Sequence, residues 1–268
     1  MTNGPGYVWP VDRFYSSENR AGFSVGSAQW QGTRQTQNDV VYVNDPQDPR
    51  GIILAIVDGI GLEREAGDAA RDAMLAIRRE FEESDPDEAM DQAALRMLGK
   101  AHRGIRQRNE RYFAEGKPQV GATGACALIR NNQLTFASVG NVRVFLLRNG
   151  LLLQLNRDHI LSLEAEERDI LRGDAPDLNP EWARQVTSYL GMEGLSKLDC
   201  QHNPIPLLPG DRIMLISSGL YSVLEEEEFS GFLTAGPAGW AAEKIVERVK
   251  SYHPNSQSNV SLVVAALG

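Results

Sequence analysis

Two turn signals in the middle of the chain constrain the fold most strongly. Asn131-Asn132 and Asn149-Gly150 each separate two short apolar runs by only two residues. Such dipeptides form two-residue hairpins because both central residues must adopt positive φ, so the flanking runs pair as antiparallel neighbours. The expected strands of this meander are 124–130, 134–140, 142–148 and 151–155.

The other apolar patterns place strands and helices in separate groups. Continuous or alternating apolar runs predict strands, and apolar residues at helical spacing predict helices. The second helix is expected to begin at a Ser84 or Asp85 cap, with Pro86 in its first turn. The expected strands are 23–32, 39–45, 51–59, 211–218 and 258–267, and the expected helical stretches are 65–81, 84–112, 157–188 (interrupted by a loop over 174–180) and 238–252.

Groups of hairpin-linked strands followed by paired helices predict antiparallel sheets in an α+β fold, and not a parallel βαβ sheet. A chain of 268 residues is long enough to bury a large core. No internal repeat or linker divides it. The interpretation is an extended N-terminal lead-in over 1–22, followed by a single domain over 23–268.

Charge and cysteine content exclude several classes of protein. The net charge of −9 argues against nucleic acid as a partner, because binding to the phosphate backbone requires a basic surface. No run approaches the roughly 18 apolar residues of a membrane-spanning helix. Cys126 and Cys200 have no metal-ligand spacing and are interpreted as free thiols in a reducing compartment. A cytoplasmic protein without a membrane partner is expected.

Polar residues follow the ends of several apolar strands. If these strands lie side by side with the same ends together, the polar groups converge on one cleft. Oxygen ligands in such a cleft would suit Mg²⁺ or Mn²⁺. One of these turns, "ILAIVDGIG", carries an aspartate, but another, "RIMLISSGL", carries a serine. The pairs at the strand ends are Asn38-Asp39, Asp58-Gly59, Gly140-Asn141, Ser218-Gly219 and Ser258-Asn259.

The order of these motifs resembles the protein phosphatase 2C family of metal-dependent serine/threonine phosphatases over roughly 23–267. "GTRQTQNDV" resembles the family's Gly-x-Arg and Glu-Asp, and "VDGIG" its Val-Asp-Gly-x-Gly. "GNVR", "SSG" and "SN" stand where the family has Gly-Asp-Ser-Arg, Ser-Asp-Gly and Asp-Asn. The resemblance implies a four-layer α/β/β/α sandwich, with two antiparallel sheets flanked by helix pairs.

The resemblance also implies roles for single residues. It implies that Asp58 bridges two metal ions, that the Gly59 carbonyl helps to hold one of them, and that Arg34 binds the substrate phosphate. Asp39 is a weaker candidate metal ligand. Four ligand positions of the family carry neutral residues here, namely Asn38, Asn141, Ser218 and Ser258.

These substitutions predict an impaired metal site. A serine hydroxyl is a poor ligand for a hard divalent ion, so at most one weakly bound Mg²⁺ or Mn²⁺ is expected. Without a second ion, activation of the attacking water is impaired. The leading hypothesis is therefore a pseudophosphatase in phospho-signalling that binds a phosphoprotein or phosphopeptide through Arg34. A cognate serine/threonine kinase or its substrate is a candidate partner.

Two alternatives remain open. The first is an active Mn²⁺- or Mg²⁺-dependent phosphatase with a rearranged metal site, in which Asp68, Asp158, Asp174 or Glu193 supplies missing ligands. The second is a scaffold whose surface acts while its cleft does not. His159 is interpreted as structural, and the acidic run 225–228 as the start of a solvated helix.

Overall fold

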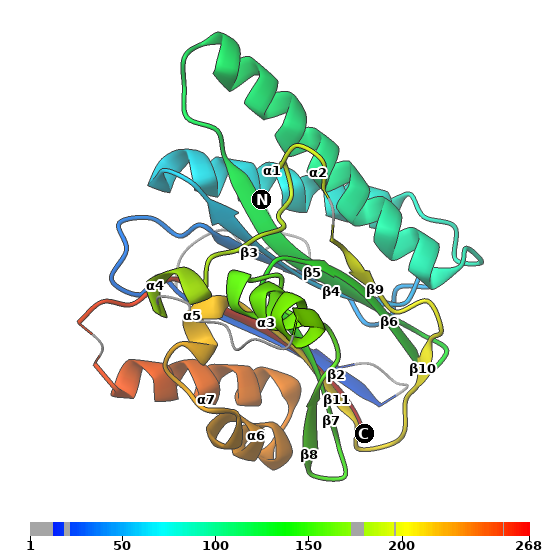
Figure 1. Ribbon diagram of the computed structural model, residues 1–268. Coiled ribbons are helices and arrows are strands. Elements are labelled where there is room, and N and C mark those ends of the chain that lie inside the picture. Colours follow the sequence, from blue (N-terminus) through cyan, green and yellow to red (C-terminus); the bar gives the residue numbers. More distant parts are fainter. Residues whose placement is uncertain (1–12, 19–21, 173–179, 196, 254) are drawn as a thin grey trace, which may run out of the picture.

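The computed structural model describes residues 13–18, 22–172, 180–195, 197–253 and 255–268. Within these residues, two antiparallel six-stranded sheets pack face to face (Figure 1). The first sheet has the order β1 (Arg13–Glu18), β2 (Phe23–Trp30), β12 (Val260–Leu267), β11 (Arg212–Ile216), β7 (Arg143–Arg148) and β8 (Leu151–Gln154). The second has the order β10 (Ile205–Pro206), β6 (Gln133–Val139), β5 (Gly121–Arg130), β4 (Ile52–Ile60) and β3 (Asp39–Val43), with β9 (Asp199–Cys200) also paired to β6.

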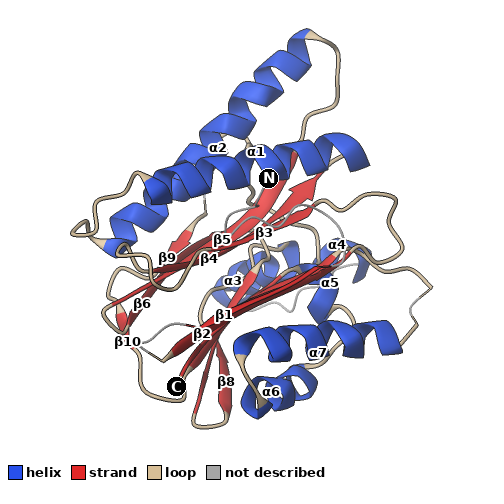
Figure 2. Cartoon of the chain, turned by 180° about the vertical axis from the view of Figure 1, so that it is seen from behind, coloured by secondary structure: helices blue, strands red, loops and turns tan. Residues whose placement is uncertain are grey.

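Helices cover the outer faces of both sheets (Figure 2). On the second sheet lie α1 (Glu63–Glu82) and α2 (Met90–Ala114), and on the first lie α6 (Glu226–Ala235) and α7 (Ala238–Ser251). The other described helices are α3 (Leu161–Arg172), α4 (Pro180–Ala183) and α5 (Ser218–Tyr221). The predicted four-layer α/β/β/α sandwich is confirmed.

The layering follows from the alternation of side chains along each strand. In β4, Ile53 packs among residues of α1 and α2, whereas Ile52 and Leu54 pack between the two sheets. Both faces of this strand are buried, which explains why it reads as one continuous apolar run. A third apolar cluster joins the first sheet to α6 and α7.

Both predicted hairpin turns are present. Asn131 and Asn132 have φ of 52° and 56°, and Asn149 and Gly150 have φ of 52° and 77°. They join β5 to β6 and β7 to β8 in antiparallel pairs. The short polar links in the sequence therefore set the strand order of this part of each sheet.

The helix predicted from the Ser84 or Asp85 cap begins later, at Met90, so that part of the prediction is wrong. The Ser84 hydroxyl donates to the Phe81 carbonyl at 2.7 Å and closes the end of α1. The Asp85 carboxylate accepts from the Asp87 backbone N–H at 2.9 Å. Both residues that resembled helix caps therefore stabilise the turn between the two helices.

Other boundaries also differ from the predictions. The strands predicted over 39–45 and 211–218 end at Val43 and Ile216. Within the predicted lead-in 1–22, β1 pairs with β2 as an edge strand. The acidic run does begin a helix, because Glu225 and Glu228 form a capping box at the start of α6. The predicted loop residues Asp174, Pro176, Asp177 and Asn179 lie outside the described residues.

One close approach fixes α7 on the first sheet. A Cβ atom at Gly26 of β2 would lie 2.3 Å from the Cα atom of Gly239 in α7. The backbones can touch here only because both positions lack a side chain. None of the helices within the described residues is long and apolar enough to cross a membrane.

Candidate functional site

The ends of β3 and β4 form the floor of a cleft. Asp39 and Asp58 lie directly opposite each other in the β3–β4 register. They line a cavity of about 190 Å³ between the two sheets. The residues lining this cavity are Arg34, Asn38, Asp39, Asp58, Gly59, Gly61, Ser218, Ser258 and Asn259. The structure thus brings together all the candidate site residues except Asn141.

Asn141 lines an adjoining cavity of about 320 Å³. Ser218 and Ser258 line both cavities and form the wall between them. The other residues lining the second cavity are Arg143, Asp158, Ile160, Arg184, Gly219, Tyr221 and Ser222. The strand ends therefore meet in a cleft with two compartments.

Asp39 is held by a buried polar network. Its carboxylate accepts a hydrogen bond from the Ser217 hydroxyl at 2.7 Å, and the Ser217 oxygen accepts from the Ser261 backbone N–H at 3.0 Å. Gln29 donates to the Asp39 carbonyl at 3.2 Å. Burial raises the pKa of Asp39, while the hydrogen bonds from Ser217 and Ser261 oppose this rise.

Asp58 is the second carboxylate of the cleft. Burial raises its pKa well above the ordinary value, and the neighbouring charge of Asp39 raises it further. The positive charge of Arg34 acts in the opposite direction. Asp39 therefore disfavours the ionised form of Asp58, whereas a hydrogen bond with Asp58 lowers the pKa of Asp39.

Arg34 lies at the exposed side of the cavity. Its guanidinium donates to the Ser258 hydroxyl at 3.2 Å. It forms no ion pair with any residue that the structure describes. Arg34 therefore brings a positive charge to the mouth of the cleft.

Asn259 fixes the loop that carries Arg34. Its side-chain oxygen accepts from the Asn38 backbone N–H at 2.8 Å. Its side-chain nitrogen donates to the carbonyls of Gln31 and Thr36 at 2.7 and 3.0 Å. One buried amide thus holds three points of the segment 31–38.

The Ser218 turn packs directly against the start of β12. A Cβ atom at Gly219 would lie 2.0 Å from the Asn259 carbonyl oxygen, so only glycine allows this approach. Gln257 also contacts the turn, because its side chain donates to the Gly219 carbonyl at 2.8 Å. These contacts place the hydroxyls of Ser218 and Ser258 on the same cavity wall.

Sequence reasoning missed several of these residues. Ser217, Gln29 and Gln257 are buried polar residues whose partners are distant in the chain. For Asn259, the available signal was its position beside Ser258 in the terminal motif. Arg184 and Tyr221 lie in segments that carried no motif.

The carboxylates considered as substitute ligands have other partners. Asp68 pairs with Arg71 on α1. Asp158 accepts a two-pronged ion pair from Arg143, with nitrogen–oxygen distances of 2.9 and 3.0 Å. Asp174 lies outside the described residues. Within the described part of the chain, no group of three or more His, Cys, Asp or Glu side chains could hold a metal ion.

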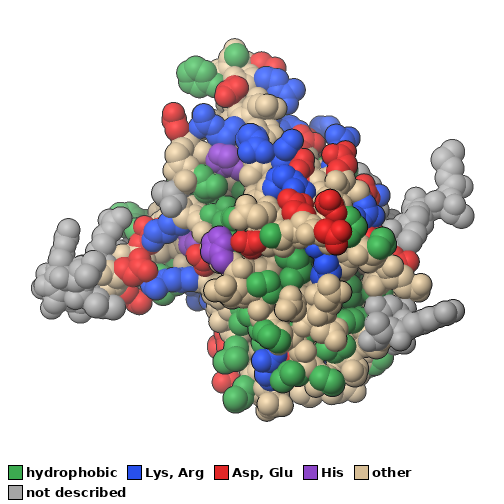
Figure 3. Space-filling view, turned by 90° about the vertical axis from the view of Figure 1, so that its right-hand side faces the viewer, with side chains coloured by type: hydrophobic (Ala, Val, Ile, Leu, Met, Phe, Trp, Pro, Cys, Tyr) green, Lys and Arg blue, Asp and Glu red, His purple; other side chains and the backbone are tan. Residues whose placement is uncertain are grey.

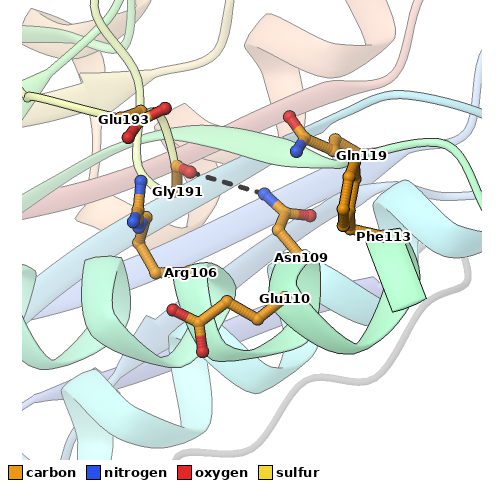
Figure 4. A pocket seen from close by; sticks show the side chains of 7 residues that line it. All are labelled: Arg106, Asn109, Glu110, Phe113, Gln119, Gly191 and Glu193. Carbon is orange, nitrogen blue, oxygen red and sulfur yellow. Dashed lines mark hydrogen bonds between the residues drawn. The ribbon is translucent and has the colours of Figure 1, made fainter.

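Glu193 lies away from the cleft. It lines a pocket of about 170 Å³ beside Arg106 and Phe113 of α2 (Figure 4). In this pocket Asn109 donates to the Gly191 carbonyl at 3.4 Å, so the loop that carries Glu193 is attached to α2.

His159 makes structural hydrogen bonds. Its Nδ1 atom accepts from the Gly140 backbone N–H at 3.1 Å, and its Nε2 atom lies 3.4 Å from the Asp199 carboxylate. The side chain is buried and lines neither cavity. Its geometry therefore matches the structural interpretation from the sequence.

Comparison with known proteins identifies the family. The family model for protein phosphatase 2C matches residues 23–172, which is more than half of the chain. The chain therefore belongs to the protein phosphatase 2C family. It is similar to the serine/threonine phosphatase stp of Listeria welshimeri, with 26% identity over 237 residues that cover 84% of this chain and 88% of that protein.

Solved structures show the same fold. A serine/threonine phosphatase of S. agalactiae superposes with a TM-score of 0.77 at 18% identity, covering 92% of this chain and 100% of that one. The catalytic domain of the serine/threonine phosphatase PstP, solved with two manganese ions, superposes with a TM-score of 0.71 at 21% identity. That match covers 91% of this chain and 97% of the PstP chain.

Proposed function

We propose that this protein is a catalytically impaired member of the protein phosphatase 2C family that binds phosphorylated serine or threonine on a partner protein. The observation that supports the proposal is the lining of the cleft. Ser218 and Ser258 line the cavity together with Arg34, and Asn141 lines the adjoining cavity. The resemblance to the family implies carboxylates at all three positions.

The donor set does not fit two divalent ions. Two such ions carry a charge of +4, whereas the carboxylates lining the cavity among the described residues are Asp39 and Asp58. Burial raises the pKa of both carboxyls in the metal-free protein. We expect at most one weakly bound Mg²⁺ or Mn²⁺, held by Asp58, the Gly59 carbonyl and Asp39. A bound ion would supply charge to attract a phosphate.

Arg34 is the proposed phosphate ligand. Its guanidinium is exposed. Among the described residues, the only hydrogen-bond partner of this side chain is the Ser258 hydroxyl. Planar guanidinium groups bind phosphate oxygens through paired hydrogen bonds. The neutral wall formed by Ser218 and Ser258 can also donate to phosphate, whereas carboxylates at these positions would repel it.

The proposal extends to partner and location. The phosphorylated ligand would be a phosphoprotein or phosphopeptide, with a cognate serine/threonine kinase or its substrate as the candidate partner. A cytoplasmic location is part of the proposal. Both cysteines, Cys126 and Cys200, are free, which is typical of a reducing compartment.

A second candidate function is that of an active phosphatase with a rearranged metal site. Two observations favour it. Asp39 and Asp58 remain opposite each other, and PstP, which shares the fold, was solved with two manganese ions. Asp158 of the adjoining cavity would be the nearest additional carboxylate, although Arg143 already pairs with it.

Two assays separate these candidates. The first measures hydrolysis of an aryl phosphate and a phosphothreonine peptide in millimolar Mn²⁺, for the wild-type protein and for Asp58→Asn. The impaired-enzyme proposal expects no turnover by either. Manganese-dependent turnover that Asp58→Asn abolishes would establish the active phosphatase instead.

The second assay measures binding of the phosphothreonine peptide by fluorescence anisotropy without metal. Arg34→Ala should weaken binding at least tenfold, since charge-assisted hydrogen bonds to phosphate contribute about 1.5–3 kcal/mol. Arg111→Ala is the matched control, because Arg111 is exposed on α2. Equal binding by both variants would contradict the assignment of Arg34.

A further inference from the structure

The cavity that adjoins the Arg34 site is lined by more guanidinium groups than carboxylates among the described residues, whereas a metal site is lined by carboxylates. Its volume, about 320 Å³, exceeds the 190 Å³ of the first cavity. Among the residues that the structure describes, the charged ones that line it are Arg143, Arg184 and Asp158. Guanidinium groups therefore outnumber carboxylates in this compartment.

Two of these charges neutralise each other. Arg143 binds the Asp158 carboxylate through two nitrogens, and that carboxylate is only 3% exposed. The guanidinium of Arg143 also lies over the Tyr221 ring, 3.8 Å from its centroid. The Tyr221 hydroxyl donates to the Asn141 carbonyl at 2.9 Å. Arg143 also lies 3.9 Å from the Glu226 carboxylate, so its positive charge is fully compensated.

Arg184 is the other charged residue that lines this cavity. It is exposed, and it forms no ion pair with the residues that the structure describes. It lies close enough to Tyr221 for its charge to oppose the burial that raises the pKa of that hydroxyl. Arg184 therefore brings a positive charge to the second cavity that no described carboxylate pairs with.

Several basic residues elsewhere on the surface have acidic partners. Lys and Arg side chains gather in the upper part of the face in Figure 3, with acidic side chains beside them. On α2, Arg96 pairs with Glu80 and Glu88, and Arg108 pairs with Asp72. An anionic ligand that enters the cleft would meet Arg184 without such competition from a described carboxylate.

We propose that the second cavity is an anion subsite that recognises an acidic group close to the phosphorylated residue, with Arg184 as the residue that determines this specificity. The inference rests on the proposed function, because it requires a phosphorylated residue at Arg34. The acidic group is either an Asp or Glu carboxylate or a second phosphate. Both accept paired hydrogen bonds from guanidinium.

Because the two cavities share a wall, a single peptide can contact both of them. The Ser258 hydroxyl accepts from Arg34 at 3.2 Å, and Ser258 also lines the second cavity. An extended peptide advances about 3.3–3.6 Å per residue. A side chain one to three residues from the phosphorylated residue can therefore enter the second cavity. The hydroxyl of Ser218 offers it a further donor.

The test compares four fluorescent peptides by anisotropy, with EDTA present so that no metal-dependent hydrolysis occurs. Each contains one phosphothreonine, flanked by alanine, by glutamate, by lysine or by a second phosphothreonine. The proteins are wild type, Arg184→Ala, Arg184→Glu and the control Arg111→Glu, which makes the same charge change on α2. Arg34→Ala tests the proposed function in parallel.

The wild-type protein should bind the glutamate-flanked peptide about five- to tenfold more tightly than the alanine-flanked one. Arg184→Ala should abolish this preference without changing affinity for the alanine-flanked peptide. Arg184→Glu should reverse it in favour of lysine. A preference that appears only with the second phosphothreonine would identify phosphate as the acidic group.

Three outcomes would overturn the inference, and they are distinguishable. If the alanine-flanked phosphopeptide binds through Arg34 but the flanking residue has no effect, the subsite is wrong and the proposed function stands. If none of the phosphopeptides binds the wild-type protein, both fail. Equal effects of Arg184→Glu and Arg111→Glu would show that only overall charge matters.

Discussion

Asp39 on β3 and Asp58 on β4 are cross-strand neighbours, so two carboxylates face each other at the floor of the cleft. Like charges in directly opposite positions destabilise a sheet. Burial and this mutual repulsion raise the pKa of Asp58 well above its ordinary value, and burial raises that of Asp39. The cleft therefore lowers the stability of the metal-free protein.

The first prediction concerns Asp58→Asn. A carboxyl whose pKa is raised in the folded state binds more protons when folded than when unfolded. Stability is therefore present at low pH and lost as pH rises from about 4 towards the raised pKa. Asn keeps the shape of the side chain without its charge. Metal-free Asp58→Asn should be more stable than wild type at pH 8 by at least about 1 kcal/mol, with a smaller gain at pH 5.

Thermal unfolding in EDTA at both pH values measures this difference. Asp87→Asn is the control, because Asp87 is exposed between α1 and α2. A destabilisation by Asp58→Asn that is equal at pH 5 and pH 8 would contradict the pKa argument, since a steric or hydrogen-bonding defect does not depend on pH in this way.

The second prediction concerns the neutral wall of the cleft. Ser218→Asp combined with Ser258→Asp would add two carboxylates to a cavity that already contains Asp39 and Asp58. The double variant should be less stable than wild type without metal, because four acids then share one site. Millimolar Mn²⁺ should restore stability by about 2–3 kcal/mol if it reaches roughly 100 times its dissociation constant.

Calorimetry and aryl phosphate hydrolysis test the double variant. Manganese-dependent turnover should appear in it and be absent from the wild-type protein. Ser230→Asp combined with Ser251→Asp makes the same charge change on α6 and α7. If the cleft variant folds but binds Mn²⁺ no better than this control, the missing acids are not what impairs the site.

The sequence predicted most of the fold because its signals were local. The asparagine turns defined two hairpins, and the unbroken apolar run in β4 marked a strand buried on both faces. The prediction from sequence was wrong where a residue type that is typical of one structure stabilises another. Ser84 and Asp85 have the chemistry of helix caps, but they close the turn after α1. The two-residue strands β9 and β10 were too short to show any periodicity.

The sequence also predicted several of the residues that line the cleft. The motifs indicated Arg34, Asp39 and Asp58, and the structure places them around one cavity. They did not indicate Arg184, which reaches the cleft through tertiary packing. Asn259 was visible only as part of a motif, and its role in fixing the segment 31–38 depends on contacts more than 200 positions apart in the sequence.

The third prediction concerns Asn109 of α2. Its buried side chain donates to the Val120 carbonyl at 2.8 Å and accepts from the Val120 backbone N–H at 2.9 Å. It also donates to Gly191 at 3.4 Å. Asn109→Ala leaves these backbone groups unpaired and should destabilise the protein by about 2–4 kcal/mol.

Urea unfolding measures this loss. Gln107→Ala is the control on the same helix, because Gln107 is exposed, and its effect should lie within about 0.5 kcal/mol of zero. A similar small effect for Asn109→Ala would mean that water replaces the amide in pairing Val120.

The last prediction concerns the contact between β2 and α7. A Cβ atom at Gly26 would lie 2.3 Å from the Gly239 Cα atom and 2.4 Å from its nitrogen. Because the obstacle is backbone, no rotamer change relieves the clash, and α7 must move away from the first sheet. Gly26→Ala should therefore destabilise the protein by about 2–3 kcal/mol, even though alanine favours a strand no less than glycine does.

Gly104→Ala is the matched control with the opposite expected sign. Gly104 lies in the interior of α2, and a Cβ atom there meets nothing within 4 Å. The substitution should stabilise the helix by about 0.5–1 kcal/mol, because glycine loses more backbone entropy on folding. Urea unfolding of both variants measures the two changes in the free energy of unfolding. If Gly26→Ala stabilises the protein as Gly104→Ala does, then α7 does not rest on β2 at this distance.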